Sequence, residues 1–481
     1  MKRVLFTIYL VLSSAMGLFS QDLIWEKIFG FEPGAFYSVK TDFEGNFITT
    51  GRSDTLIGSA FANRGVTMKL DEYGAIIWRS DILEVNGLAA GTVSHDLVFA
   101  DDAGSIVITG HSIFQNAPVG GLLVRQYSTD GQTAWDKRYG FGNHVVSGGC
   151  IAKTTDGGYI IAGTYDNALF LMKSDINGDS TWFRVYSCFL PYFDAMGQWS
   201  KFYGKILETD DHGYMLCYTS QVPVTSMSVI QFNSYGDTLW TRNYNQGQAS
   251  MGNSITRTPD GNYLICGSQT NSFISDATII KIDPSGNILS YKSYDQFGFS
   301  DEFSSLVMDV EGNYIAAGYT TQVYAAYQEM GYVVKTNSAG DTIWSAFDGE
   351  GTYATAEEIF DIDLTEDNGT ILCGTAGGHP FLTRLNSDGG GFVGIEDYQE
   401  DQDKMSICVR DNSLVIDLSE SANRLHKLNL TITNMVGKNI KKLEVAYSQI
   451  IKINISDLVP GAYLLSFKDE IIHKTIKFLK Q

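Results

Sequence analysis

The chain has 481 residues, of which 44% are apolar, so it can bury a large core and is not expected to be disordered. Acidic residues outnumber basic ones by 55 to 34, which gives a formal net charge of −21. A surface of this sign repels phosphate polyanions, so the composition argues against nucleic acid as a partner.

The first 20 residues have the composition of a secretory signal peptide. Met1-Lys2-Arg3 is a cationic start, and the apolar run Val4–Leu12 is too short to span a bilayer. Small residues follow, so cleavage is expected after Gly17 or Ser20. We expect export of the mature chain with no transmembrane segment after signal removal.

Residues 21–393 repeat one pattern seven times. Its full form is Asp260-Gly261-Asn262-Tyr263-Leu264-Ile265-Cys266-Gly267, followed by Ile279-Ile280-Lys281-Ile282-Asp283-Pro284-Ser285-Gly286. Four short strands with Gly-containing turns in a repeat of about 50 residues predict the blades of a β-propeller. The residues that open the second strands are Phe47, Ile106, Tyr159, Tyr214, Tyr263, Tyr314 and Thr370.

The two ends of this region fit one another. Residues 23–30 copy a fourth strand such as Leu239–Tyr244, whereas the seventh repeat runs into Gly389-Gly390-Gly391 and lacks one. We therefore expect residues 23–30 to close the last blade, which would remove an exposed sheet edge.

The six cysteines of an exported chain suggest disulfides, but three of them occupy one repeated position. Cys217, Cys266 and Cys373 stand just before the second-strand Gly position, each in a different blade. The Cα atoms of equivalent residues in different blades are expected to lie farther apart than a disulfide can span, so we expect these three to be buried free thiols. The pairing of Cys150, Cys188 and Cys408 is left open.

The last residues leave the repeat. Residues 394–404 read as an acidic linker, and 405–481 contain short alternating strands that predict a small Ig-like β-sandwich. The whole chain is thus predicted to be all-β. Within the tail the segments Asn434–Lys438, Ile453–Tyr463 and Lys474–Lys477 occur in order, and they carry the distinctive residues Gly437, Gly461, Tyr463, Lys474 and Lys477.

This tail resembles the type A C-terminal sorting domain of Bacteroidetes type IX secretion system cargo proteins. The resemblance implies that the secretion machinery is a partner, that the protein crosses the outer membrane, and that it is then released or attached to the cell surface. The repeats resemble those of secreted bacterial β-propellers, a likeness that implies no activity.

Length variation among the connections is confined to one face of the predicted ring. The second-to-third and fourth-to-first connections vary, whereas the others are uniformly short. Function concentrates on loops carried by a rigid scaffold, so this long-loop face is the predicted binding face. Its longest connections are Gly51–Val66, Ser80–Ser94, Tyr186–Tyr203 and Tyr319–Gly331.

Aromatic and histidine side chains on this face are the candidate ligand contacts. Aromatic rings with nearby polar groups suit sugar stacking or a protein hot spot, although such a loop can equally fold its rings onto a neighbouring blade. Three histidines could also form a zinc site, but their spacing matches no known ligand pattern, and no metal or cofactor is expected. The candidates are Phe114, Tyr192, Phe193, Trp199, Tyr203, His95, His111 and His144.

Two further groups have a functional and a structural interpretation. The connection between blades six and seven carries four carboxylates, Asp348, Glu350, Glu357 and Glu358. Paired carboxylates could hydrolyse a glycan, but a solvated acidic loop is the simpler interpretation. A cation recurs on the third strands, as in Lys69. Its repetition favours a structural ion pair over an anion site.

These features predict an exported cell-surface or secreted propeller that binds a glycan or a protein through its long-loop face. A glycan-cleaving hydrolase or lyase is one alternative, and a structural surface or adhesion component is another.

Overall fold

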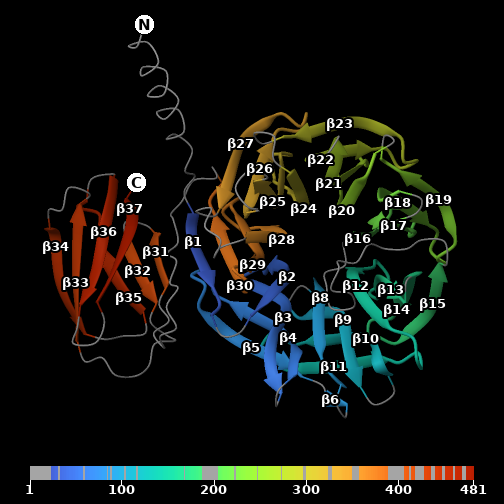
Figure 1. Ribbon diagram of the computed structural model, residues 1–481, viewed down its shortest axis with the longest axis horizontal. Coiled ribbons are helices and arrows are strands. Elements are labelled where there is room, and N and C mark those ends of the chain that lie inside the picture. Colours follow the sequence, from blue (N-terminus) through green and yellow to red (C-terminus); the bar gives the residue numbers. More distant parts are fainter. Residues whose placement is uncertain are drawn as a thin grey trace, which may run out of the picture. The chain divides into compact units, whose positions relative to one another are not determined.

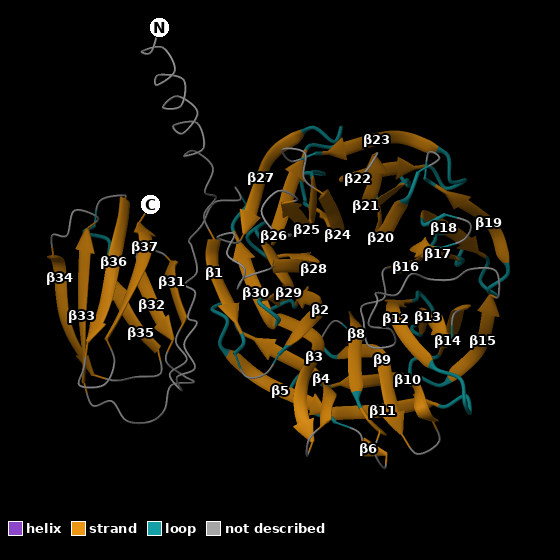
Figure 2. Cartoon of the chain, viewed as in Figure 1, coloured by secondary structure: helices purple, strands orange, loops and turns teal. Residues whose placement is uncertain are grey.

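A computed structural model describes most of residues 23–480, but not 1–22, 187–203, 349–356, 388–405, 418–426 and several shorter connections. All described regular elements are β-strands (Figure 2). The predicted signal peptide and linker lie outside the described residues. The chain forms two compact units: the larger covers Ile28–Ile343 and Asp348–Leu382, and the smaller includes Thr383–Gln481. No helix in the described part is long and apolar enough to cross a membrane.

Seven four-stranded antiparallel sheets surround a central axis (Figure 1), which confirms the predicted seven-bladed propeller. Blade one comprises β2 (Gly34–Thr41), β3 (Phe47–Ile57), β4 (Ala60–Leu70) and β5 (Ile76–Ile82). Blade two comprises β8 (Thr92–Phe99), β9 (Ile106–Phe114), β10 (Ala117–Tyr127) and β11 (Thr133–Tyr139). Blade three comprises β12 (Val146–Lys153), β13 (Tyr159–Tyr165), β14 (Ala168–Ser174) and β15 (Ser180–Tyr186). Blade four comprises β16 (Gly204–Glu208), β17 (Tyr214–Ser220), β18 (Ser226–Phe232) and β19 (Thr238–Asn243). Blade five comprises β20 (Ser250–Arg257), β21 (Tyr263–Asn271), β22 (Ile274–Ile282) and β23 (Ile288–Tyr294). Blade six comprises β24 (Ser300–Met308), β25 (Tyr314–Gln322), β26 (Gln328–Thr336) and β27 (Thr342–Asp348).

Blade seven joins the two ends of the repeat region. Its strands run in the order β1 (Leu23–Ile28), β30 (His379–Leu385), β29 (Thr370–Ala376) and β28 (Glu357–Leu364). The strand from residues 23–28 is thus the outermost one, and the Phe29 backbone N–H donates to the Pro380 carbonyl at 2.8 Å. A ring closed in this way leaves no blade with a missing edge strand.

Adjacent blades are joined by apolar layers and by a repeated tyrosine contact. In one layer Leu169 and Leu171 of blade three pack with Leu216 and Phe232 of blade four. At the rim, the Tyr244 hydroxyl donates to the Gly286 carbonyl of the next blade at 2.9 Å, and other fourth-strand tyrosines make the equivalent contact. The repeat is therefore a pattern of contacts between blades as well as within them.

The cysteine prediction is confirmed for its three repeated positions. Cys217, Cys266 and Cys373 are buried free thiols in three blades, and Cys150 is a fourth. Burial raises the pKa of the Cys217 and Cys150 thiols. The side chains of Cys188 and Cys408 lie outside the described residues.

The C-terminal residues form two antiparallel sheets. One contains β31 (Ser406–Arg410), β32 (Ser413–Asp417) and β35 (Ile450–Asn454), and the other contains β34 (Asn439–Ala446), β33 (Lys427–Asn434), β36 (Gly461–Lys468) and β37 (His473–Lys480). Alternate side chains such as Ile416, Ile432, Ile453 and Leu465 are buried, as period-two patterning requires.

Candidate ligand-binding face and central pocket

The long-loop face is built largely from extended hairpins. The prediction of loops at Gly51–Val66 and Tyr319–Gly331 was wrong over most of their length, because β3 pairs with β4 out to Ile57 and Ala60, and β25 pairs with β26 out to Gln322 and Gln328. Polar cross-strand contacts support the first extension, where Arg52 Nη1 donates to Asn63 Oδ1 at 3.3 Å.

Most predicted aromatic contacts fall where the structure makes no statement. Tyr192, Phe193, Trp199 and Tyr203 lie in residues 187–203, outside the described part. Phe114 ends β9, but its side chain is likewise outside the described part. Ligand binding by these five residues therefore remains a prediction.

His144 belongs to a surface cluster on the long-loop face. Its Nδ1 lies 2.7 Å from Asp166 Oδ2, and its ring lies 4.7 Å from that of Tyr165. Because the carboxylate accepts, Nδ1 carries the proton, and in the neutral imidazole Nε2 is a hydrogen-bond acceptor. The side chains of His144 and Asp166 are 52% and 46% exposed. The hydrogen bond from His144 keeps the pKa of Asp166 below its usual value.

Asp166 is held by its turn as well as by the imidazole. It adopts a left-handed backbone with φ of +50°, in the short connection between β13 and β14. Its Oδ1 accepts the Val145 backbone N–H at 2.9 Å, and its own N–H donates to the Val145 carbonyl at 2.7 Å. The carboxylate–imidazole pair is therefore preorganised by two connections of blade three.

The structure separates the three predicted histidines. His95 is 4% exposed and stacks on Tyr37 at the centre of the ring, with 5.5 Å between ring centroids. His111 is fully buried, with Nδ1 3.1 Å from the Val146 carbonyl, and burial lowers its pKa to about 4. A surface ligand cannot reach His111, which is a correction to its assignment. Within the described residues no His, Cys, Asp and Glu side chains are grouped to hold a metal ion.

The two acidic candidates whose side chains are described, Glu357 and Glu358, do not face one another. Glu357 and Glu358 are consecutive in β28, paired with Ala376 and Thr375, so their side chains point to opposite faces of the sheet. Glu357 is buried. The side chains of Asp348 and Glu350 lie outside the described part. The described residues therefore supply no pair of glutamates on one side of a substrate.

The third-strand lysines form ion pairs within their own blades. Lys69 and Lys335 lie 2.7 and 2.9 Å from Asp42 and Asp309 of the first-to-second turns, and Lys173 and Lys281 make the corresponding contacts. These four lysines support the structural interpretation, because each is paired with a turn carboxylate.

A repeated β-bulge is the feature that the sequence analysis missed. In six blades the innermost strand has one extra residue opposite the second strand, and blade four lacks it. The second-strand Gly opposite the bulge is required, because a Cβ on Gly110 would lie 2.0 Å from the Val93 carbonyl oxygen. A repeated Gly inside a strand is itself a signal for a bulge. The extra residues are Tyr37, His95, Gly149, Asn253, Ser304 and Phe360.

These extra residues line a pocket at the centre of the ring, together with four of the residues that follow them, Asp96, Ser254, Ser305 and Asp361. Blades seven, one and two contribute an aromatic wall, since Tyr37 lies 5.5 Å from both the Phe360 and His95 rings. Blades three to six contribute Gly149, Gly204, Lys205, Asn253, Ser254, Ser304 and Ser305. One side of the pocket thus carries three aromatic rings together with Asp96 and Asp361, and the other is polar or lacks side chains.

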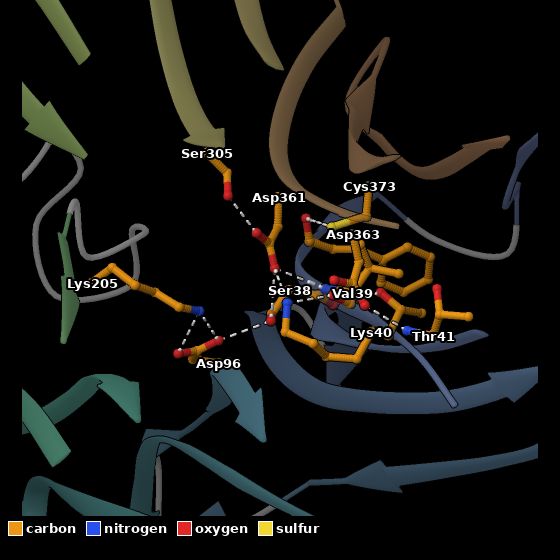
Figure 3. Close-up of polar contacts among 12 residues, drawn as sticks. Ser38, Val39, Lys40, Thr41, Asp96, Lys205, Ser305, Asp361, Asp363 and Cys373 are labelled. Atoms are coloured by element: carbon orange, nitrogen blue, oxygen red, sulfur yellow. Dashed lines mark hydrogen bonds and ion pairs between the residues drawn. The ribbon is translucent and has the colours of Figure 1, made fainter. Parts of the chain in front are cut away.

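A chain of polar contacts crosses this region from blade six to blade four (Figure 3). Ser305 Oγ donates to Asp361 at 2.7 Å. Ser38 Oγ lies 3.0 Å from Asp361 and 2.8 Å from Asp96, and its proton is donated to one of them at a time. Lys205 Nζ then lies 3.0 and 3.1 Å from the two oxygens of Asp96.

Backbone donors also hold the two aspartates. The Ile151 N–H donates to Asp96 at 3.0 Å, and the Val39 N–H donates to Asp361 at 3.2 Å. Burial by itself would lower the pKa of Lys205, but Asp96 and then Asp361 raise it, so the ammonium stays charged. The same balance raises the pKa of Lys40 through Asp361, Asp363 and Asp96.

Comparison with known proteins identifies the C-terminal part. Residues 410–481 match a family described as the secretion system C-terminal sorting domain. No curated protein matches the sequence.

Solved structures resemble the chain only weakly. A protein of unknown function from Bacteroides caccae is 12% identical, covers 60% of this chain and 92% of its own, and has a TM-score of 0.38. Sqt1 from Chaetomium thermophilum is 12% identical, covers 82% and 96%, and has a TM-score of 0.45. Drosophila Plexin A, in complex with Semaphorin 1b, is 10% identical, covers 76% and 87%, and has a TM-score of 0.43.

The sorting domain marks proteins that the type IX secretion system delivers to the cell surface or the extracellular space. The strands β31–β37 cover the matched segment, and seven blades precede it. The chain is therefore a type IX secretion system cargo protein that carries a seven-bladed β-propeller.

Proposed function

We propose that this exported propeller is a binding protein that takes an extracellular glycan on its long-loop face. The observation that carries the proposal is the surface cluster of His144, Asp166 and Tyr165. Its imidazole is half exposed, is fixed by a carboxylate at 2.7 Å, and in its neutral form offers one acceptor nitrogen.

The surroundings of the cluster suit a sugar. The rings of Phe141 and Phe183 lie 4.6 Å apart, and both pack against Tyr165. The ring that contacts the His144 imidazole is therefore itself held by two aromatic neighbours. Sugars present apolar C–H faces and hydroxyl edges, and a rigid ring with an adjacent fixed acceptor recognises both. Binding, with no bond cleavage, is favoured because Glu357 and Glu358 point to opposite faces.

The test is glycan-array binding by the purified full chain, with His144→Ala beside the parent. His144→Ala should weaken binding to the bound glycan about tenfold, the effect of one good polar contact. A matched control is His212→Asn, which changes an imidazole that is 67% exposed in a first-to-second turn on the other face. Asparagine fits there, because Asn368 occupies the equivalent turn with φ of +63° beside +59° for His212.

Equal binding by the His144→Ala and parent chains would reject the cluster as the site. An array without any signal would reject glycan binding by this protein.

A further inference from the structure

The polar chain at the centre of the ring connects most of the blades to one another. Its contacts from Ser305 to Lys205 join side chains of blades six, seven, one, two and four (Figure 3). Blade three adds the Ile151 N–H, which donates to Asp96. Blade five reaches the same region through Asn253, which lines the central pocket. The contents of the pocket therefore decide how blade five joins the chain.

The Asn253 side chain has a fixed orientation and a buried acceptor. The residue is 4% exposed, and its Nδ2 donates to Glu302 and to the Phe303 carbonyl, both at 2.8 Å. Because both partners are acceptors, they select the amide nitrogen and turn the oxygen away from blade six. The buried Oδ1 has no hydrogen-bond partner in the described part of the chain. Such an acceptor costs free energy unless a molecule in the pocket donates to it.

The pocket admits only very small molecules. Its volume is about 30 Å³, which is room for one or two water molecules. The groups that border it include the carboxylates of Asp96 and Asp361 and the serines Ser254 and Ser304. Small cavities stay dry where apolar side chains line them, and they hold water where several polar groups can bond to it. Both the size and the lining of the pocket therefore favour water.

The charges around the pocket disfavour an ion. Asp96 lies 3.0 Å from Lys205, and Asp361 lies 3.4 Å from Lys40. An added cation would meet two ammonium groups, an added anion would meet two carboxylates, and either would lose its hydration. Water carries no charge, and it can donate to an amide or carboxylate oxygen while it accepts from a serine hydroxyl.

We propose that the central pocket is a binding site for ordered water, in which one water molecule donates both to Asn253 Oδ1 and to a carboxylate of the polar chain, Asp96 or Asp361. The water satisfies the buried acceptor and links blade five to the chain. All seven blades are then joined by hydrogen bonds around the axis. The inference is independent of the proposed function, because His144 is not among the residues that line the pocket.

The first test is a high-resolution crystal structure of the full chain. Electron density for a water should lie in the pocket, with contacts of about 2.7–3.2 Å to Asn253 Oδ1 and to Asp96 or Asp361. A pocket without density would overturn the proposal. Contacts shorter than about 2.6 Å to several oxygens would also overturn it, because they would identify a bound cation.

The second test counts buried waters in solution by magnetic relaxation dispersion of the solvent, which detects waters with long residence times. Ser304, the extra residue of the blade six bulge, is 3% exposed and lines the pocket. Ser304→Val adds methyl groups that fill the pocket, so this variant should hold at least one long-lived water fewer than the parent. The matched control is Ser290→Val, the same change at an exposed position of β23, and it should keep the parent's number.

The two measurements keep the proposal open to refutation. Equal numbers of long-lived waters in the Ser304→Val and parent chains would show that the pocket holds no ordered water and would overturn the proposal. If Ser304→Val folds poorly, the crystal structure of the parent chain decides the outcome by itself.

Discussion

Replacing Lys205 with methionine tests whether the polar network at the centre holds the blades together. Lys205 of blade four contacts both oxygens of Asp96 of blade two, and their side chains are 27% and 5% exposed. Met keeps the apolar stem of the side chain, so the substitution removes mainly the charge.

The size of the effect follows from the contact distance and the burial. At 3.0 Å and an effective dielectric constant near 20, two unit charges attract by about 5 kcal/mol before desolvation is subtracted. Asp96 keeps the Ser38 hydroxyl and the Ile151 N–H as donors, so it is not left bare. We expect Lys205→Met to lower the free energy of unfolding by about 3 kcal/mol, the lower end for breaking a buried pair.

Lys292→Met is the matched control. Lys292 makes a single contact of 2.9 Å with Asp341, but the two side chains are 42% and 62% exposed. A surface pair of this kind contributes less than about 1 kcal/mol. The comparison therefore holds the residue change and the contact distance constant and varies burial.

The assay is urea unfolding followed by tryptophan fluorescence. All seven tryptophans lie between Trp25 and Trp344, so the signal comes from outside the sorting domain. The midpoint should shift while the urea dependence stays constant. If Lys205→Met costs no more than Lys292→Met, the central ion pair does not stabilise the ring and the reasoning fails.

Three further predictions concern titration, thiol access and export. The pKa of His111 is about 4 in the folded chain and near 6.5 in the unfolded chain, so the unfolded chain binds more protons between those pH values. The free energy of unfolding should therefore fall by up to about 3 kcal/mol from pH 6.5 to pH 4. Urea unfolding at each pH should show that His111→Asn removes this loss. Cys217, Cys266 and Cys373 should react slowly with a thiol reagent in the native protein and fully in urea, and rapid native labelling would contradict their burial. Deleting Met405–Gln481 should leave a folded propeller in the periplasm, so fractionation that finds it at the cell surface would contradict the role of the tail.

The ring could be predicted from the sequence because its contacts repeat. The Gly of the third-to-fourth turn has a positive φ and also packs on the tryptophan of the preceding blade; a Cβ on Gly286 would lie 2.9 Å from Trp240. Both residues therefore recur with the blade. Cys217 could be placed in the core on the same ground, because its position in the repeat is one for small buried residues.

The candidate site was less predictable because it depends on differences between blades. The segment Gly51–Val66 was interpreted as a loop because it is one of the long connections between second and third strands, yet pairing of Arg52 with Gly65 and of Asp54 with Asn63 continues the hairpin. His111 and His144 both lie in or beside strands on the long-loop side of their blades. The His111 ring packs against Gly120 of its own blade and is buried, whereas the His144 side chain is half exposed. Only the three-dimensional packing distinguishes them.

Blade four shows how one departure from the repeat changes the pocket. Its second strand carries Tyr218 where six other blades have Gly, and β16 pairs with β17 without a bulge. A side chain at that position excludes the bulge, because the carbonyl that the bulge brings forward would lie where the Cβ stands, as it would at Gly110. Gly204 and Lys205 therefore enter the pocket in regular register, and Lys205 is the cation among the described lining residues. Tyr218 in place of Gly looks like an imperfect repeat, yet it occurs in the blade whose Lys205 balances the charge of Asp96. Departures from a repeat are therefore the places to look for function in a propeller.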